Sequence, residues 1–395
     1  MALLAIILAS CNGGGGNTDD ATPVTTASPE IRETPDNVWL DLLSRVPADQ
    51  DATYGIVMSD FASFREALDI AQPAHDAPGQ EIFDYVGSIS LLRDEAGNLI
   101  QSGINTPELI AGSQFNADFE AVRTRWGFTI ADLDQSLSVL SNDRSLEILR
   151  GRFDGAAIGD ALRNDAAFAN ALQVDEQQGV TFYGWIGAPP TAPVSQQEID
   201  AAQRLGLSLA IDENLVYYDR TDRIVGVVNA ASGLSPSLTD IDGIRLLAEG
   251  LGRYDLYAAG LGGRTTTVSV AAEIQCGIGC PEDTLAAIES ELRAQGVLLP
   301  FDTYVTGAGR DGEGFYFVAI VLHSDEATAQ TNADLLRQRI ERGATTTSQE
   351  KWNAILRDLE ISAEGPLLYL IAHVDAPSLW SQLLFAGNLL LLTED

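Results

Sequence analysis

The sequence is poor in the side chains that most enzyme active sites use. Its 395 residues include one lysine, Lys351, three histidines (His75, His323 and His373) and three cysteines. A lysine that holds a phosphate or forms a Schiff base therefore has a single candidate. The sequence also lacks a GxSxG nucleophile elbow, an HExxH metal motif and a P-loop. We therefore expect no catalytic residue, no metal site and no cofactor.

Positive charge is scarce as well. The chain has 23 lysines and arginines against 57 acidic residues, which gives a formal net charge of −34. Nucleic-acid binding needs clustered basic side chains for the phosphates, so we expect no nucleic-acid partner. The same deficit excludes docking on anionic lipid through basic residues. Because apolar residues make up 45% of the chain, it can bury a core and is not globally disordered.

The N-terminus carries one short apolar run, at residues 2–9. It is too short to span a bilayer, which takes about 20 apolar residues, but it has the length of a signal-peptide core. The following tetrapeptide, Leu8-Ala9-Ser10-Cys11, resembles the lipobox of bacterial lipoproteins. The resemblance implies that residues 1–10 are a signal peptide and that Cys11 is lipidated. No basic residue precedes Cys11, so we interpret the signal as truncated. A buried N-terminal strand is the alternative.

Residues 11–36 are predicted to form a flexible linker. Four glycines follow Asn12, and threonine, aspartate, serine and proline dominate the rest. Such a segment buries too little surface to offset its ordering entropy, and as a coil it reaches about 25–30 Å. Acyl chains bind a bilayer without any basic patch, at about 0.8 kcal/mol per buried methylene. We therefore expect an extracytoplasmic protein that is anchored to a bacterial membrane by lipidated Cys11.

The other two cysteines, Cys276 and Cys280, form a Cys-Gly-Ile-Gly-Cys sequence. In an oxidising compartment a close pair of this kind indicates a disulfide, and the glycines allow the tight turn. Metal binding is the alternative, but it needs two further ligands, and no histidine lies within forty residues in sequence.

The body of the chain repeats one pattern, in which a β-rich run is followed by Asp and then by a helical pattern. The aspartates are Asp60, Asp154 and Asp375, and a weaker copy has Asp325. In the first three, an apolar residue lies four positions after the Asp and a leucine lies eight after it, on one helix face. Because a carboxylate at a helix start accepts from unpaired backbone N–H groups, we expect these residues to be N-caps and not catalytic groups.

Short β-rich runs and helical patterns alternate between these units. Predicted strands include residues 180–186, 215–218, 224–229, 256–260 and 265–274, and predicted helices cover 239–251, 281–295 and 326–342. This mixture predicts an α+β fold on mixed or antiparallel sheets. Turn residues cluster at 232–237, so the sequence predicts two related halves, 37–235 and 236–395.

Three segments carry a further resemblance: residues 149–154 (Leu-Arg-Gly-Arg-Phe-Asp), the pair Tyr183-Gly184 and residues 215–229. On these segments, residues 38–260, which span the first half and the start of the second, resemble a group of uncharacterised extracytoplasmic proteins of bacteria and archaea. The resemblance implies an extracytoplasmic location and adds no catalytic residue.

Three further motifs have a structural and a functional interpretation. The GxGxxG sequence at 307–312 fits a dinucleotide motif, but β-like residues follow it where a helix is required, so a hairpin is favoured. Asp240 and Asp242 carry part of a calcium-loop pattern, for which capping is favoured. His323 and His373 each precede an Asp by two residues; they either share a site or are separate, hydrogen-bonded and partly buried.

These observations favour a lipid-anchored binding or interaction protein without catalytic activity. The alternative is an anchored solute-binding protein for a small ligand, and a hydrolase is less favoured. A solute receptor should have two lobes with a deep cleft between them, whereas an interaction protein should expose an apolar patch.

The anchor gives the first prediction. With an intact signal restored, the protein expressed in a bacterium should be acylated and should fractionate with membranes. Cys11→Ser removes the only acceptor thiol of the lipobox, so acylation and membrane retention should both be lost. Mass spectrometry and fractionation measure these outcomes, and a serine variant that stays in the membrane fraction would contradict the prediction.

Overall fold

The computed structural model describes residues 37–394 except 51–54, 94–96, 108, 111–117, 142–144, 166–170, 186–205, 263–265, 278, 346–349 and 386–389. The predicted signal peptide, Cys11 and the linker lie outside the described residues. Within them, no helix combines the length and the apolar content needed to cross a membrane.

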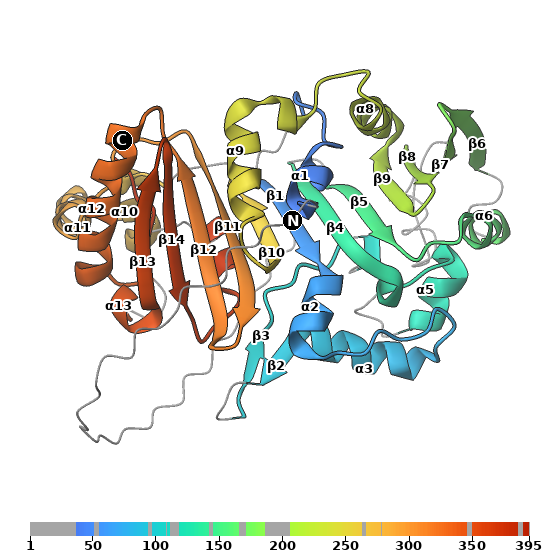
Figure 1. Ribbon diagram of the computed structural model, residues 1–395, viewed down its shortest axis with the longest axis horizontal. Helices are drawn as coiled ribbons and strands as arrows, with labels where there is room; N and C mark the ends of the chain where they lie inside the picture. Colours follow the sequence, from blue (N-terminus) through green and yellow to red (C-terminus); the bar gives the residue numbers. More distant parts are fainter. Residues whose placement is uncertain are drawn as a thin grey trace.

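The fold is α+β, and one antiparallel sheet of twelve strands runs through the described chain (Figure 1). A separate hairpin contains β2 (Leu91–Arg93) and β3 (Leu99–Gln101). The strands of the large sheet, in spatial order, are β13 (Arg357–Glu364), β14 (Leu367–His373), β12 (Gly314–Leu322), β11 (Thr303–Asp311), β10 (Leu256–Leu261), β1 (Gly55–Asp60), β4 (Leu133–Leu140), β5 (Leu146–Gly151), β9 (Leu215–Arg220), β8 (Leu207–Asp212), β7 (Val180–Trp185) and β6 (Leu172–Gln177).

The two predicted halves meet at the middle of this sheet, where β1 pairs with β10. Outward from this seam, the first half places β4, β5, β9 and β8, and the second half places β11, β12, β14 and β13. When the hairpins β2–β3 and β6–β7 are set aside, each half has a single strand, then one hairpin, and then a second hairpin whose later strand lies nearer the seam. The halves therefore repeat one topology, and β7 and β6 extend the first half.

Helices cover both faces of the sheet. One face packs against α2 (Phe61–Leu68), α3 (Gly79–Ser90), α5 (Phe119–Trp126), α6 (Gly155–Asn164), α10 (Val268–Cys276), α11 (Glu282–Ala294), α12 (Glu326–Arg342), α13 (Trp352–Ile355) and α14 (Leu379–Phe385). The other packs against α1 (Val38–Leu43), α8 (Thr221–Ala231) and α9 (Asp242–Leu251). Because successive strand residues point to opposite faces, Val57 of β1 lies in the first core and Ile56 and Met58 lie in the second.

Three of the aspartates that follow strands cap helices. The Asp60 carboxylate accepts from the Ser63 N–H at 3.0 Å and begins α2. Asp154 accepts from the Ala156 and Ala157 N–H groups and begins α6. Asp325 does the same for α12 through Thr328. These bonds satisfy backbone donors that have no partner inside the helix.

The cap predicted at Asp375 is wrong. Helix α14 begins at Leu379, and the exposed Asp375 carboxylate instead accepts from the Arg357 guanidinium at 2.6 Å. The sequence signal that should have corrected the prediction is Pro377, since the residue before a proline is disfavoured in helical conformation. The apolar spacing remains informative, because Leu379 and Leu383 are buried on one face of α14.

Two predicted strands are helices. Residues 224–229 lie in α8, and residues 268–274 of the predicted strand 265–274 lie in α10. In α8 the buried residues Ile224, Val227 and Val228 have helical spacing. Their packing on the sheet therefore outweighs the strand preference of β-branched side chains.

The disulfide between Cys276 and Cys280 is present and links the end of α10 to the residue before Pro281 and α11. The GxGxxG segment is part of the β11–β12 hairpin, as the strand-like residues after it indicated. Gly307 and Gly309 lie inside β11, where an added Cβ would meet backbone carbonyls of Ala258 and Asp255. Close packing, and not phosphate binding, therefore accounts for these glycines.

The caps give the second prediction. Asp154→Ala leaves the first N–H groups of α6 without their acceptor and should lower the free energy of unfolding by about 0.5–2 kcal/mol. Asp154→Asn keeps a side-chain oxygen acceptor and should cost much less. Urea unfolding of the two variants measures both effects.

Asp375→Ala is the control for this experiment. It removes only an exposed ion pair with Arg357, which is worth about 0–1 kcal/mol. If Asp154→Ala is no more destabilising than Asp154→Asn, the capping interaction does not stabilise α6.

Candidate functional site

A groove of about 750 Å³ lies over the seam, on the face of the sheet that α1 and α9 cover. Side chains from both halves line it. Its described lining consists of Asn37, Val38, Trp39, Leu40, Asp41, Ser44, Asp60, Ser63, Gln135, Arg150, Thr239, Arg245, Gly252, Tyr254 and Leu256. Histidine, cysteine and lysine are absent from this lining, so its chemistry is that of charged, amide, hydroxyl and aromatic groups.

Arg150 organises the polar side of the groove. One end of its guanidinium donates to Gln135 Oε1 at 2.8 Å, and the other end pairs with the Asp41 carboxylate. Arg150 comes from β5, Gln135 from β4 and Asp41 from α1. This bridge therefore fixes α1 against the sheet while leaving a fifth of the arginine side chain accessible (21%).

The N-terminal end of α1 joins the two halves. Asn37 accepts from the Trp39 and Leu40 N–H groups at 3.1 Å and caps the helix. Its Nδ2 donates to the carbonyl oxygen of Ala248 in α9 at 2.7 Å. A residue of the first half thus ties one wall of the groove to a helix of the second half.

Asp60 lies at the groove with only 5% of its surface exposed. Burial raises the pKa of this carboxyl above its usual value, and the hydrogen bonds from Ser63 oppose the shift without cancelling it. The residue is therefore a helix cap whose charge is costly to keep in the folded protein.

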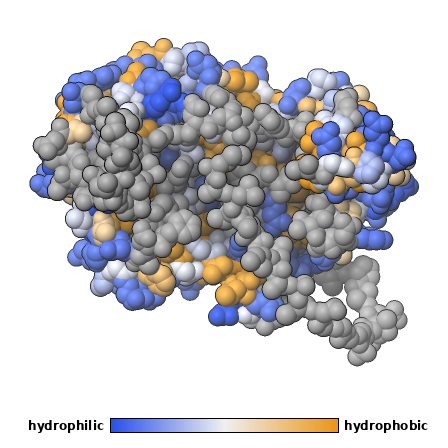
Figure 2. All heavy atoms as spheres, turned by 180° about the vertical axis from the view of Figure 1, so that it is seen from behind, coloured by the Kyte–Doolittle hydropathy of each residue, from blue (hydrophilic) through white to orange (hydrophobic). Residues whose placement is uncertain are grey.

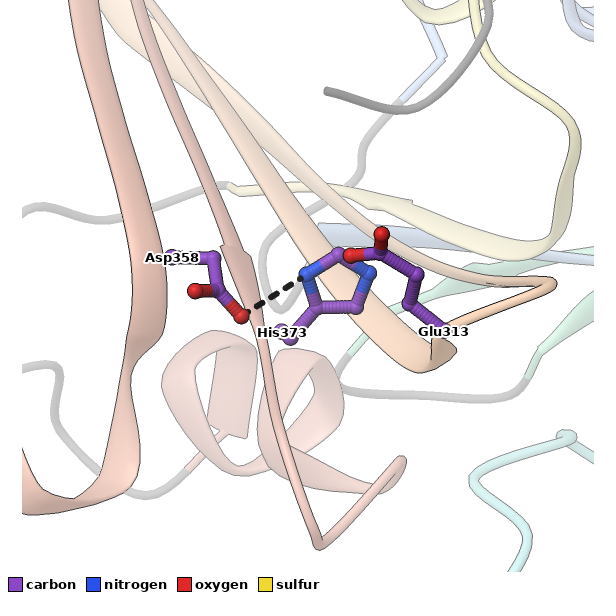
Figure 3. Close-up of side chains that lie close together, drawn as sticks. All are labelled: Glu313, Asp358 and His373. Carbon is purple, nitrogen blue, oxygen red and sulfur yellow. Dashed lines mark ion pairs between the residues drawn. The ribbon is translucent and has the colours of Figure 1, made fainter. Parts of the chain in front are cut away.

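A second cluster surrounds His373 at the end of β14 (Figure 3). The imidazole is almost fully buried, and its Nε2 lies 3.2 Å from Asp311 Oδ2. Its Nδ1 lies 3.5 Å from Asp358 Oδ2, and Glu313 completes a group whose ligand atoms lie within 4.8 Å of one another. One imidazole and two carboxylates at this spacing could hold a metal ion, which the sequence did not predict.

His323 and His373 form no common site. Tyr316, near the start of β12, pairs with His373, whereas His323 follows the other end of that strand. His323 contacts Asn332 at 2.8 Å and the Pro366 carbonyl at 3.2 Å, and burial lowers its pKa. The geometry therefore favours the interpretation as separate, hydrogen-bonded histidines, and both are more fully buried than the partial burial that was predicted.

Sequence reasoning identified little of either site. Of the residues it singled out, Asp60 lines the groove, whereas Asp154 and the disulfide cysteines do not. Arg150 and Asp41 carry no motif and are joined only by the packing of α1 on the sheet. The calcium pattern is explained by capping, because Asp240 accepts from the Ser237 N–H at 2.7 Å in a capping box.

Comparisons with known proteins add no family. No family model matches the sequence, and no curated protein matches it. Among solved structures, the protein is similar to the chain described as crystal form I of TP0453, with a TM-score of 0.31 and 7% identity over 87% of this chain and 96% of that chain. A likeness of this size supports no conclusion about activity.

The burial of Asp60 gives the third prediction. Because its folded-state pKa is raised, the penalty for the charged carboxyl is absent below the unfolded pKa near 3.8 and grows as the pH rises through the folded value. Asp60→Asn keeps a capping oxygen without the charge. It should therefore be more stable than the wild type at pH 7, by a margin that shrinks as the pH falls toward 3.8.

Urea unfolding at several pH values measures this margin. The matched control is Asp154→Asn, the same exchange at a cap that is exposed to solvent. An Asp60→Asn variant that is less stable than the wild type at pH 7 would show that the charge stabilises the fold.

Proposed function

We propose that this protein is a lipid-anchored, extracytoplasmic binding or interaction protein without catalytic activity, and that the groove over the seam receives a polar segment of a partner protein. The observation that carries this proposal is the groove itself, which draws its lining from both halves. An anchored solute-binding protein for a small ligand is the alternative. Membrane attachment would come from acylated Cys11.

The groove offers the mixture of groups that recognises a polar polypeptide. Asp41 and Arg150 supply both signs of charge, and Leu40 and Tyr254 supply apolar surface beside them. Protein interfaces are typically built from aromatic and arginine anchors with polar groups around them.

The continuity of the sheet favours an interaction protein over a two-lobed receptor. Strands β1 and β10 are hydrogen-bonded across the seam with four paired positions, from Ile56 with Leu261 to Ser59 with Ala258. A receptor that closes on its ligand needs two bodies that move relative to each other. Here the same movement would break a central pair of strands.

An exposed apolar surface also supports an interaction role. Phe83 of α3 is 49% exposed, and Leu91 and Leu99 on one face of the β2–β3 hairpin are 47% and 59% exposed. Figure 2 shows hydrophobic surface along the lower edge of the molecule, where α3 and this hairpin lie in Figure 1. Exposed apolar groups of this kind are typical of contact surfaces.

The hydrolase hypothesis has one structural feature in its favour. His75 Nδ1 lies 2.9 Å from the fully buried Asp132 carboxylate, an arrangement that orients a general base. In the described part of the chain, however, no hydroxyl or thiol hydrogen-bonds to the other ring nitrogen of His75. Asp132 also accepts from the Thr129 N–H at 2.8 Å in a capping box, which gives it a structural role.

The fourth prediction tests the groove as the contact site. A photo-crosslinking amino acid at Leu40 should give a discrete protein adduct in cells that export the protein. Arg150→Glu reverses the charge at the polar side of the groove and should reduce the adduct about tenfold or more, which corresponds to about 1.4 kcal/mol. Immunoblotting of the irradiated cells measures it.

The matched control carries the same amino acid at Leu299, which is 41% exposed and lies outside the groove. Equal adducts from both positions, or no adduct from Leu40, would contradict the proposal. A small molecule that co-purifies in native mass spectra and is lost with Arg150→Glu would instead support the solute-binding alternative.

A further inference from the structure

We infer that Glu313, Asp358 and His373 form a binding site for a divalent transition-metal ion, with Asp311 as the residue that orients the histidine. The inference is independent of the groove and of the proposed function. It depends on where the antiparallel register places Asp358 and His373 relative to Asp311 and Glu313, which lie more than forty residues earlier in the sequence.

The register assembles the site from four neighbouring strands, β11, β12, β14 and β13. Tyr316 of β12 pairs with His373 of β14, and Arg357 of β13 pairs with the same histidine from the other side. The β11–β12 turn therefore reaches His373 on one side, carrying Asp311 and Glu313. On the other side, β13 has an irregularity between Arg357 and Glu360, and bulges of this kind redirect a side chain. Asp358 lies within it with φ at +49°.

The two nitrogens of His373 have different surroundings. Nε2 lies 3.2 and 3.3 Å from the two oxygens of Asp311, within hydrogen-bonding distance. Asp311 is itself held in place, because its Oδ1 accepts from the Glu313 N–H at 2.8 Å and the Gly314 N–H at 3.1 Å. A carboxylate that accepts from one ring nitrogen fixes the tautomer whose other nitrogen has a free lone pair.

That other nitrogen, Nδ1, lies 3.5 Å from Asp358 Oδ2. This separation is at the upper limit for a hydrogen bond. It matches the edge of a tetrahedron around zinc, because metal–ligand bonds of about 2.0–2.2 Å place neighbouring ligand atoms about 3.3–3.6 Å apart. A carboxylate oxygen of Glu313 lies within 4.8 Å of an Asp358 carboxylate oxygen and of a ring nitrogen of His373. It is exposed, so a change of rotamer can bring it into the first coordination sphere (Figure 3).

Charge points to the same conclusion. Three carboxylates converge on one imidazole, and neither Asp311 nor Glu313 forms an ion pair with arginine or lysine in the described chain. A divalent cation would offset their mutual repulsion. The imidazole ligand favours zinc over calcium, which prefers oxygen ligands alone. Three protein ligands leave a fourth position for water or for a donor group from a partner.

Isothermal titration of the full chain with zinc chloride, after removal of metal by a chelator, tests the inference. One saturable site per chain is expected. Glu313→Gln and Asp358→Asn each remove a charged ligand on the surface and should weaken binding at least tenfold. Asp311→Asn should weaken it by about 10–100-fold through the orientation of His373.

Glu364→Gln is the matched control, because it removes one exposed carboxylate from the same strand, β13, outside the cluster. It should leave the affinity unchanged. At the same zinc concentration, zinc should also raise the melting temperature of the wild type by more than that of Asp358→Asn. His373→Ala should abolish binding. If this buried substitution unfolds the protein, the variants at the exposed residues Glu313 and Asp358 still test the site.

Three outcomes would overturn the inference. The first is the absence of a saturable site. The second is an equal loss of affinity in Glu364→Gln, which would indicate non-specific binding to an acidic surface. The third is displacement of zinc by an equal concentration of calcium, since a site built on imidazole should discriminate against calcium.

Discussion

The antiparallel pairing of β1 with β10 is the constraint on which the rest of the structure depends. It joins two halves of one topology edge to edge, so each half gives up an exposed strand edge and the product is one sheet of twelve strands. Both seam strands are buried along their whole length. The helices before them, α1 and α9, then meet over the seam, and the groove exists because they cover the sheet there only in part.

Much of the fold could be predicted from the sequence because its signals are local. The helix expected at 326–342 is α12, and that expected at 281–295 is α11, where Pro281 precedes the first turn. The strand-preferring residues of α8 and α10 misled the prediction, since the burial that decides between helix and strand comes from contacts with distant strands. The prediction at Asp375 was also only partly correct. The buried face of the helix was predicted correctly, but the helix begins at Leu379 and not directly after Asp375.

The candidate sites were far less accessible to sequence reasoning. The His373 cluster combines residues from positions 311, 313, 358 and 373, and only the register of four strands brings them together. The acidic residues of the cluster are not spaced from His373 as in a known metal-binding motif, so no local sequence pattern indicates the site. The Arg150 bridge likewise joins residues 109 positions apart. By contrast, the disulfide was predictable because its two cysteines and the turn between them are adjacent in sequence.

The attachment of Asn37 has a mechanical consequence. The described chain starts at this residue, which caps α1 and also hydrogen-bonds to Ala248 in the other half. A pull transmitted through the preceding chain would therefore enter the molecule at its centre and would be shared between the halves. The force would act near the middle of the sheet, because six strands lie on one side of β1 and five lie on the other. The outermost strands, β6 and β13, would therefore lie at nearly equal distances from the attachment, counted in strand pairings.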